Sequence, residues 1–455
     1  MEPVPNPPLR FTTLPEELIE RVCLQLYQGS QYAYVLESGA VSLSAVCRTS
    51  KLLKRIASPI LYRQFCFGGK LSMSARFLRT ICQEQDLAEA VQYLRIWRPD
   101  SNGLADEDIK FFTEVAEKLG LNLGALDVAN PWHRRSYEII VQLLIAQTSN
   151  LKGLEFRGIS ICEDRFELLR QLAAQDPRRV SLSKLRYFKY GADYSGHKIR
   201  LGYFDSLLEL APNIQSLCMP CYDPLTRSLA NINQVTELSL RYGCISPEGL
   251  GTITHCCDAI HSFNMEAAGF EQVAIIEGKL TRHCIPPSRV ITIIEPHKTW
   301  LRHLDLGSSG TWCQDHHERK KCEHKEQGFS VRAFSSLETF KINGRCVLYP
   351  EVNDHTNTFV NMLPRSIRRF HIFSAQKQAP ANMITLATAI DVDFPDLDEI
   401  LLNDHLCPVC QRGELKPVFE EADITVLSQL FKVAGVAFLR NAPRIDNHCR
   451  VIEEW

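Results

Sequence analysis

The sequence carries almost no net charge and no long apolar run. Its 51 lysine and arginine residues nearly balance 53 aspartate and glutamate residues, which leaves a formal net charge of −2 over 455 residues. This balance gives no general electrostatic attraction to nucleic acid or to an anionic membrane. Apolar stretches such as Val433–Leu439 fall far short of the roughly 18 residues that a membrane-spanning helix needs. We therefore expect no nucleic acid and no membrane among the partners.

A secretory signal is also missing, although cysteine is plentiful. Residues Met1–Arg10 contain four prolines and no apolar core, unlike a signal peptide. The 17 cysteines are scattered along the chain and odd in number. Without a secretory signal, this pattern is typical of reduced thiols that are buried as small apolar groups. We expect a cytoplasmic and/or nuclear protein.

The familiar enzyme motifs are absent too. The sequence has no GxxxxGK[ST] phosphate loop, no GxGxxG after a strand, no GxSxG elbow and no HExxH motif. We therefore expect no catalytic residue, no cofactor and no enzyme activity. One alternative stays open, an enzyme on an α/β scaffold, because any two carboxylates can meet in space.

Two groups of cysteine and histidine have metal-binding chemistry without the usual spacing. Cys407-Pro-Val-Cys410 could supply half a zinc site or a redox pair, but no second CxxC follows at zinc-ribbon distance. The other group comprises Cys313, His316, His317, Cys322 and His324. Its spacing matches no common zinc finger, and charged residues surround it. We expect a solvated, flexible insertion at about 308–327 and no metal, although the sequence does not decide whether either group binds one.

Residues 11–67 have the pattern of a small all-helical module. Leu14-Pro15 opens a first helical run, in which Leu14, Leu18, Val22 and Leu26 recur at helical spacing with Ile19 and Cys23 beside them. After a polar stretch at 28–39, a second run places Leu43, Val46, Cys47, Leu53 and Ile56 on one side. We expect Pro59 to end this run and Ile60–Tyr62 to start a short third element.

This module resembles the F-box. The resemblance rests on Leu14-Pro15, then Val46-Cys47-Arg48, then Pro59 followed by Leu61-Tyr62, in that order. Two departures are a long connection at 28–40 and Lys51, where the family often has tryptophan. The alternative is that these residues are only the core of a helical domain. The resemblance implies docking on a Skp adaptor through Leu14, Pro15, Leu18, Ile19, Val22, Val46 and Leu61.

From about residue 70 onward, a template of apolar-x-x-apolar-x-apolar recurs. Clear instances begin at Val91, Leu151, Leu185, Ile214, Val235, Ile260, Leu301, Leu337, Ile367 and Leu397, and weaker ones at Leu123 and Val433. Starts at 185, 214, 235 and 260 differ by 29, 21 and 25 residues, and those at 301, 337, 367 and 397 by 36, 30 and 30. Helical patterns lie between them at 106–119, 136–146, 164–172, 203–210, 249–256 and 356–363. Strands that alternate with helices at this period are typical of a solenoid.

The strand template resembles the leucine-rich repeat, although its periods are irregular and the usual Asn or Cys after the strand is mostly absent. We expect an α/β fold, with the F-box-like module at 11–67 followed at 68–455 by a leucine-rich-repeat-like solenoid with a parallel sheet. Leu238, Leu304, Phe340 and Phe370 should be buried on successive strands of that sheet. The alternative is an ordinary α/β domain of βα units.

The two resemblances together imply a substrate receptor of a Skp–cullin–F-box ubiquitin ligase. The partners would then be a Skp adaptor, a cullin scaffold and a target protein that the sequence does not name. Three rivals are a repeat scaffold without a ligase role, an α/β enzyme and a zinc-dependent module. Aromatic residues and arginine anchor many protein interfaces. We expect the target on outward sheet positions that include Tyr93, Arg95, Trp97, Arg157, Tyr187, Arg241, His303, Asp305, Arg369 and His371.

Overall fold

A computed structural model describes most of the chain. The described residues are 14–28, 36–67, 71–97, 104–121, 131–157, 166–175, 180, 182–191, 204–222, 232–267, 274–276, 279–281, 285–307, 329–344, 347, 357–373, 379–403 and 419–440. The cysteine and histidine groups at 313–324 and 407–410 lie outside them, as does the weak repeat at Leu123. Among the described residues, no helix is long and apolar enough to cross a membrane.

Three helices form the N-terminal module: α1 (Glu16–Gln28), α2 (Leu36–Cys47) and α3 (Lys51–Tyr62). Their shared core consists of Ile19, Cys23, Leu43, Leu53, Ala57 and Ile60, all buried. Ser50 separates α2 from α3, because its hydroxyl accepts the N–H of Leu53 (3.1 Å) and so caps α3.

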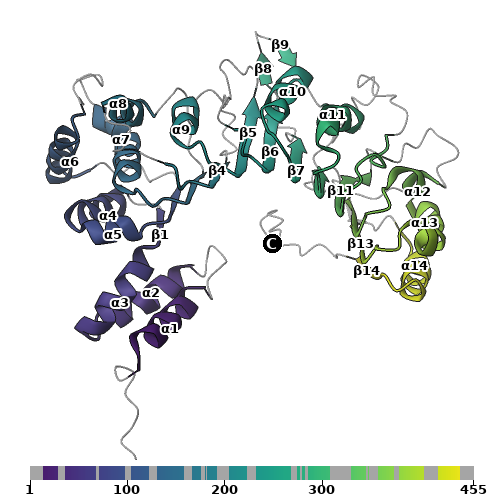
Figure 1. The fold of residues 1–455 in the computed structure, drawn as a ribbon, viewed down its shortest axis with the longest axis horizontal. Coiled ribbons are helices and arrows are strands. Elements are labelled where there is room, and N and C mark those ends of the chain that lie inside the picture. Colours follow the sequence, from purple (N-terminus) through teal and green to yellow (C-terminus); the bar gives the residue numbers. More distant parts are fainter. Residues whose placement is uncertain are drawn as a thin grey trace, which may run out of the picture. The chain divides into compact units, whose positions relative to one another are not determined.

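Twelve strands of the described chain form one open, parallel sheet in which the strand order follows the sequence (Figure 1). They are β1 (Gln64–Phe67), β2 (Tyr93–Trp97), β3 (Gly153–Arg157), β4 (Tyr187–Gly191), β5 (Ser216–Tyr222), β6 (Glu237–Cys244), β7 (Ser262–Ala267), β10 (His303–Leu306), β11 (Thr339–Asn343), β12 (Arg369–Phe373), β13 (Glu399–Leu402) and β14 (Ala437–Arg440). A separate antiparallel pair consists of β8 (Ala274–Ile276) and β9 (Lys279–Thr281).

The chain divides into two compact units. The first contains α1–α3, strands β1–β3, the beginning of β4, and five further helices, α4 (Leu71–Gln83), α5 (Gln85–Ala90), α6 (Asp106–Lys118), α7 (Pro131–Gln147) and α8 (Glu167–Gln175). The second contains β5–β14 and five helices, α10 (Pro247–His255), α11 (Pro287–Ile294), α12 (Thr358–Met362), α13 (Ala379–Asp393) and α14 (Glu421–Val433). A short helix, α9 (Asp205–Leu210), is divided between them.

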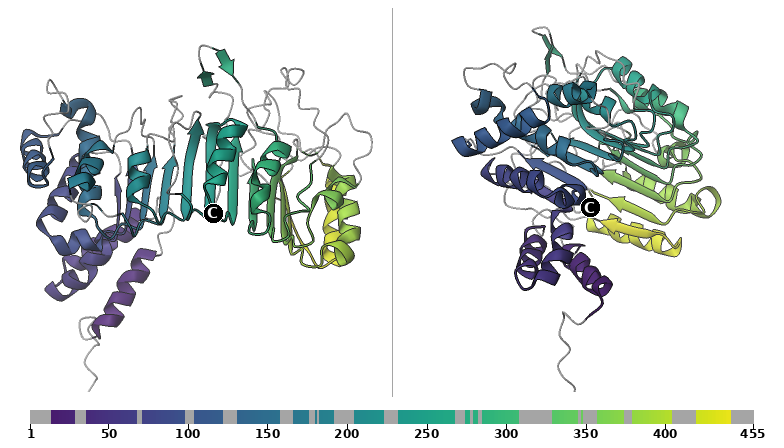
Figure 2. Two further views of the ribbon diagram at one scale, coloured as in Figure 1. Left: turned by 45° about the horizontal axis from the view of Figure 1, so that its top comes forward. Right: turned by 60° about the vertical axis from the view of Figure 1, so that its left-hand side comes forward.

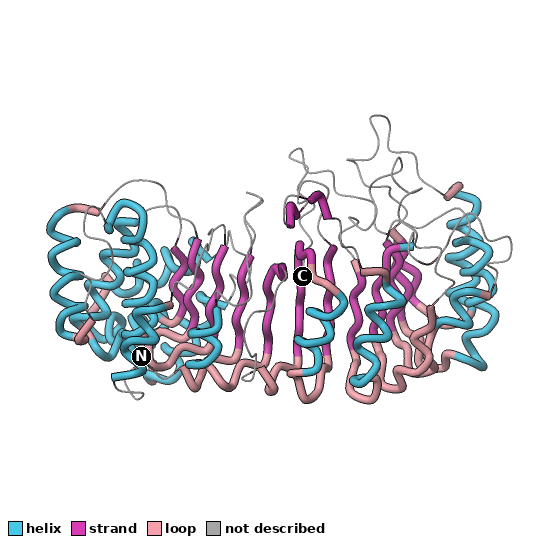
Figure 3. The backbone as a smooth tube through the Cα atoms, turned by 90° about the horizontal axis from the view of Figure 1, so that it is seen from above, coloured by secondary structure: helices cyan, strands magenta, loops and turns pink. Residues whose placement is uncertain are grey.

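Helices of the second unit all lie along one side of its strands (Figures 2 and 3). The side chains between these two layers form the core. Leu238 on β6, Leu304 on β10, Phe340 on β11 and Phe370 on β12 are at most 1% exposed. Neighbouring strands hold these residues in register, for example Leu304 opposite Phe340 and Phe340 opposite Phe370. The prediction that all four are buried on one parallel sheet is confirmed, but the strands are not all successive, because β7 lies between β6 and β10.

A repeated hydrogen-bond pattern starts most strands of the sheet. Two successive N–H groups of one repeat donate to a single carbonyl of the repeat before it. Arg302 and His303 donate to His261 (2.8 and 3.0 Å), and Glu338 and Thr339 donate to Arg302 (2.8 and 2.9 Å). The same arrangement begins in the first unit, where Gln92 and Tyr93 donate to Arg63 (2.8 and 3.0 Å). The pattern fixes the register at the N-terminal end of these strands.

Most predicted strands and helices are present, and the differences have local causes. Ser246 caps α10 as expected, since its hydroxyl accepts the N–H of Gly249 (3.0 Å). Pro59 does not end a helix, because α3 continues through it to Tyr62. The predicted second run is two helices, divided at Ser50. Gln64–Phe67, predicted as part of the helical module, is instead the first strand of the sheet.

Candidate protein-interaction surfaces

Helix α1 presents an apolar stripe to solvent. Leu18 is 44% exposed, Val22 39% and Leu26 41%. Residues four apart lie on the same face of a helix, so these three side chains form one continuous line. Val41 on α2, 64% exposed, is another large apolar side chain on the module's surface. An exposed apolar stripe of this kind is typical of a protein-binding face.

The seven predicted Skp-contacting residues divide between the core and the surface of the module. Leu18 and Val22 are exposed, whereas Ile19 is completely buried. Leu14, Val46 and Leu61 are partly buried and pack against the core. Pro15 is exposed, and its carbonyl accepts the N–H groups of Leu18 (3.0 Å) and Ile19 (3.1 Å). Leu14 thus packs toward the core, whereas Pro15 is exposed and its carbonyl starts the first turn of α1.

Direct contacts join the module to the sheet within the first unit. The Tyr27 hydroxyl at the end of α1 donates to Oε1 of Gln64 on β1 (3.1 Å). Burial raises the pKa of Tyr27 to about 12, against a smaller opposing effect of Arg63 and Arg95. Phe77 of α4 stacks on Tyr62 of α3 and on Phe65 of β1, with ring centroids 5.5 and 3.6 Å apart. Helix α1 is therefore connected to β1 by a hydrogen bond, and α3 through stacked aromatic rings.

The outward face of β2 and β3 carries an ion-paired cluster. Three pairs face each other across these strands: Tyr93 and Gly153, Arg95 and Glu155, Trp97 and Arg157. Glu155 is 4% exposed, and its Oε2 lies 2.7 Å from Nε of Arg95 while its Oε1 lies 2.6 Å from Nε of Arg157. The Arg157 guanidinium also lies over the Trp97 ring, 5.5 Å from its centroid. One buried carboxylate therefore orients two arginines.

The absence of a side chain at Gly153 leaves room for the Tyr93 ring on this face. A Cβ at position 153 would lie 2.5 Å from Cδ1 of Tyr93 and 3.5 Å from Cδ1 of Tyr187. Because glycine has no Cβ, the Tyr93 ring lies directly over the β3 backbone beside Tyr187. The predicted positions Tyr93, Arg95, Trp97, Arg157 and Tyr187 are thus close neighbours.

A second group of polar side chains follows the outward face of the second unit. The register aligns His303, Thr339, Arg369 and Glu399 in one row across the strands. The neighbouring row aligns Ser239, Asn264, Asp305, Lys341 and His371. Arg241 lies further along β6, where its Nε donates to Oγ of Ser239 (3.4 Å). This face mixes charges of both signs.

Hydrogen bonds hold several of these side chains against the sheet. Nε2 of His371 lies 2.7 Å from Oε1 of Glu399. Burial lowers the pKa of His371. This effect outweighs that of the hydrogen bond between His371 and Glu399, which raises the pKa. Burial also lowers the pKa of His303, with Glu338 acting in the opposite direction. Asp305, another predicted outward position, is 7% exposed and accepts a hydrogen bond from Asn264 (3.4 Å).

Two contributors to these surfaces were not predicted as site residues. Leu26 extends the exposed stripe on α1, and its spacing of four from Val22 was the available signal. Glu155 is the shared partner of two arginines, and this role depends on the pairing of β2 with β3, which sequence spacing does not specify.

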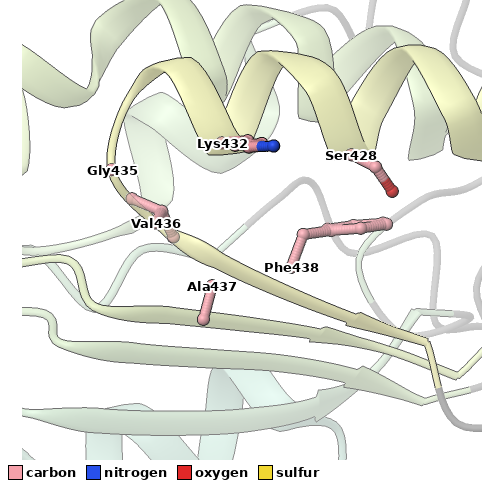
Figure 4. Close-up of a pocket in the computed structure, with 6 residues that line it drawn as sticks. All are labelled: Ser428, Lys432, Gly435, Val436, Ala437 and Phe438. Carbon is pink, nitrogen blue, oxygen red and sulfur yellow. The ribbon is translucent and has the colours of Figure 1, made fainter.

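A pocket of about 440 Å³ lies between α14 and β14. Figure 4 shows its lining, which consists of Ser428, Lys432, Gly435, Val436, Ala437 and Phe438. Lys432 is the single titratable side chain among them, whereas an acid–base site needs several that converge. Across the described residues, no group of three or more His, Cys, Asp or Glu side chains is arranged to hold a metal ion.

Comparison with known proteins gives no family for this chain. No protein-family model matches it, and no curated protein matches it.

Proposed function

We propose that this chain is a non-enzymatic substrate-recognition adaptor of a Skp–cullin–F-box ubiquitin ligase. In this proposal α1–α3 form an F-box-like module that binds the Skp adaptor. The strand–helix repeats form a leucine-rich-repeat-like solenoid that captures the target protein, and the cullin scaffold joins through Skp. The chain acts in the cytoplasm and/or the nucleus, without a cofactor and without binding nucleic acid or membrane. Its contribution to ubiquitin transfer is proximity.

The observation that carries the proposal is the apolar stripe of Leu18, Val22 and Leu26 on a helix whose opposite face fills the module's core. A small module that leaves such a stripe exposed is suited to bind another protein. The stripe also starts at the Leu14-Pro15 turn on which the F-box resemblance rests. The hydrogen bond between Tyr27 and Gln64 supports the adaptor role, because an adaptor has to connect its Skp-binding helix to the sheet that binds the target.

Co-purification with a recombinant Skp adaptor tests the proposal. Replacing Leu18 and Val22 together with Asp places two charges on the stripe without entering the buried core. The matched control replaces Val392 on α13 and Val426 on α14, which are 72% and 48% exposed, with Asp. Wild type and the control should retain Skp, and the α1 variant should lose it. Retention of Skp by the α1 variant would show that the stripe is not the docking face.

A second candidate function is a repeat scaffold that binds proteins without a ligase. The mixed aromatic and charged face of the sheet favours it, because that face would capture a protein partner in either case. The same co-purification separates the two candidates, since a scaffold without a ligase role would not bind Skp.

A further inference from the structure

Arg95 and Arg157 each have guanidinium N–H donors that Glu155 does not use. Each guanidinium has five N–H donors, and each arginine directs its Nε toward Glu155. Neither arginine makes another ion pair or hydrogen bond within the described structure, apart from the stacking of Arg157 on Trp97. Their side chains are 23% and 39% exposed, so an oxyanion from outside can reach the Nη groups. The two positive charges are opposed by one negative charge, and the cluster has an excess of one positive charge.

The positive charge of this face extends toward β1. Arg63 and Arg95 both lie near enough to the Tyr27 phenol to act on its pKa. Across the chain, by contrast, basic and acidic residues nearly cancel. The cluster is thus a local site of anion affinity on a protein without general anion affinity.

The aromatic side chains beside the arginines add apolar contact surface and an unused donor. Tyr93 is 39% exposed, and its ring is held over Gly153. Nε1 of Trp97 is buried and has no acceptor within the described structure. A buried donor without a partner carries a desolvation cost that a ligand oxygen relieves. If an extended peptide carried the oxyanion, the oxyanion would bind the guanidinium groups. A neighbouring side chain of that peptide would then pack on the Tyr93 ring.

We propose that Tyr93, Arg95, Trp97 and Arg157, oriented by Glu155, bind an acidic side chain of a partner polypeptide. The ligand chemistry is an oxyanion, either the carboxylate of Asp or Glu or the phosphate of a phosphorylated residue. Fixed guanidiniums bind either of these through paired hydrogen bonds. The inference rests on the proposed function only in naming that partner as the ligase target.

Three immobilised pools of nine-residue peptides test the site. Each pool is random at the flanking positions and has glutamate, phosphoserine or glutamine at the centre. The test variant of the full chain is R95Q/E155Q/R157Q, which removes the arginines without leaving Glu155 buried and unpaired. The matched control, R365Q/R368Q/D398Q, likewise removes two arginines and one acid from the other unit, where Arg368 pairs with Asp398 (2.7 Å). Skp binding is measured on the same samples.

We expect wild type and the control to be retained by the glutamate pool, the phosphoserine pool or both about tenfold more than by the glutamine pool. That preference should vanish in the test variant and weaken with added salt. The stronger of the two acidic pools identifies the source of the oxyanion. If the test variant unfolds, R157K replaces it, which keeps the charge and loses the forked geometry, and its acid preference should fall.

Equal retention of wild type by the three pools overturns the inference, as does an acid preference that survives in the variants. Displacement of the acidic peptides by a twelve-nucleotide single strand more strongly than by free acidic peptide would assign the site to nucleic acid instead. Loss of Skp binding by L18D/V22D tests the proposed function and is independent of the peptide-pool result. The proposed function can therefore fail while the acidic site stands, and the reverse also holds.

Discussion

Nε2 of His297 lies 3.0 Å from the carbonyl oxygen of Thr254, and this contact joins the 3₁₀ turn after α11 to α10. Nδ1 of the same ring accepts the N–H of Ile260 at 3.4 Å, so Nε2 carries the proton and the ring is neutral. His297 is 5% exposed, and burial lowers its pKa. A neutral imidazole is therefore part of the packing between two successive repeats.

Acid should destabilise the second unit through this histidine. Its pKa in the folded chain is below the ordinary value of 6.5, so its contribution to stability is complete above pH 6.5 and is lost as the pH falls through the folded pKa. Protonation also removes the acceptor of Ile260. Between pH 7.5 and 5.5 the melting temperature of wild type should fall more than that of H297Q. Equal falls would show that another group is responsible.

Leu14 and Pro15 should matter through the start of α1. The L14A/P15A variant loses packing against the module's core and the conformational restriction of Pro15, so α1 should be poorly oriented and Skp binding should be abolished. Hydrogen exchange should show the repeats of the second unit unchanged. Undiminished Skp binding would contradict the F-box-like assignment.

Ile19 and Leu18 provide a contrast between core and surface on one helix. Ile19 is completely buried, so I19A should cost about 2–5 kcal/mol of unfolding free energy. Leu18 is 44% exposed, so L18A should change stability by less than about 1 kcal/mol and should weaken Skp binding instead. Chemical denaturation and a Skp titration measure the two effects. Similar stability losses for both variants would mean that Leu18 is buried in solution.

Phe340 should support its neighbours on both sides. It lies opposite Phe370, with ring centroids 5.9 Å apart, and opposite Leu304 on the other side. F340A should cost about 3–5 kcal/mol. Because each repeat contacts mainly the adjacent ones, hydrogen exchange should accelerate first in β10, β11 and β12. Uniform acceleration across all twelve strands would contradict this repeat-like behaviour.

The outward face of the second unit should affect target capture without affecting Skp binding. Changing Arg241, His303 and Arg369 together to Ala removes three of its polar anchors, all of which retain some exposure. Retention of a target identified by crosslinking should fall, and Skp binding should persist. Loss of both activities, or of neither, would exclude this face as the recognition surface.

Strand positions were predictable because the apolar positions of the repeated template are the buried positions of the strands. Val235, Leu238 and Leu240 are all buried, and the same alternation repeats at Leu337, Phe340 and Ile342. Local chemistry also placed α10, since the cap at Ser246 needs no tertiary contact. Strand β1 was missed because Gln64–Phe67 is short and its four residues are recognisable as a strand only when paired with β2. The prediction that Pro59 ends a helix was wrong, because the burial of Ala57 and Ile60 on either side of it outweighs the hydrogen bond that proline removes.

The surfaces were harder to predict than the fold. The spacing of Leu18 and Val22 predicted an apolar side of a helix, and the fold shows that this side faces solvent. The cluster around Glu155 needed the register that brings Arg95 opposite it. A sequence lists the outward residues of each strand, and only the pairing of strands shows which of them share a partner.

Most strands of the sheet are fixed where they begin, by two N–H groups that donate to one carbonyl of the preceding repeat. The template starts are nevertheless between 21 and 36 residues apart in the two series from 185 to 260 and from 301 to 397. Since the anchored end holds the register, added residues are tolerated at the other end of a repeat without shifting its neighbours. Such a fold can gain or lose a binding loop in one evolutionary step and keep its scaffold intact. Loop grafting at the C-terminal ends of the strands is accordingly the natural way to redirect this protein toward a new partner.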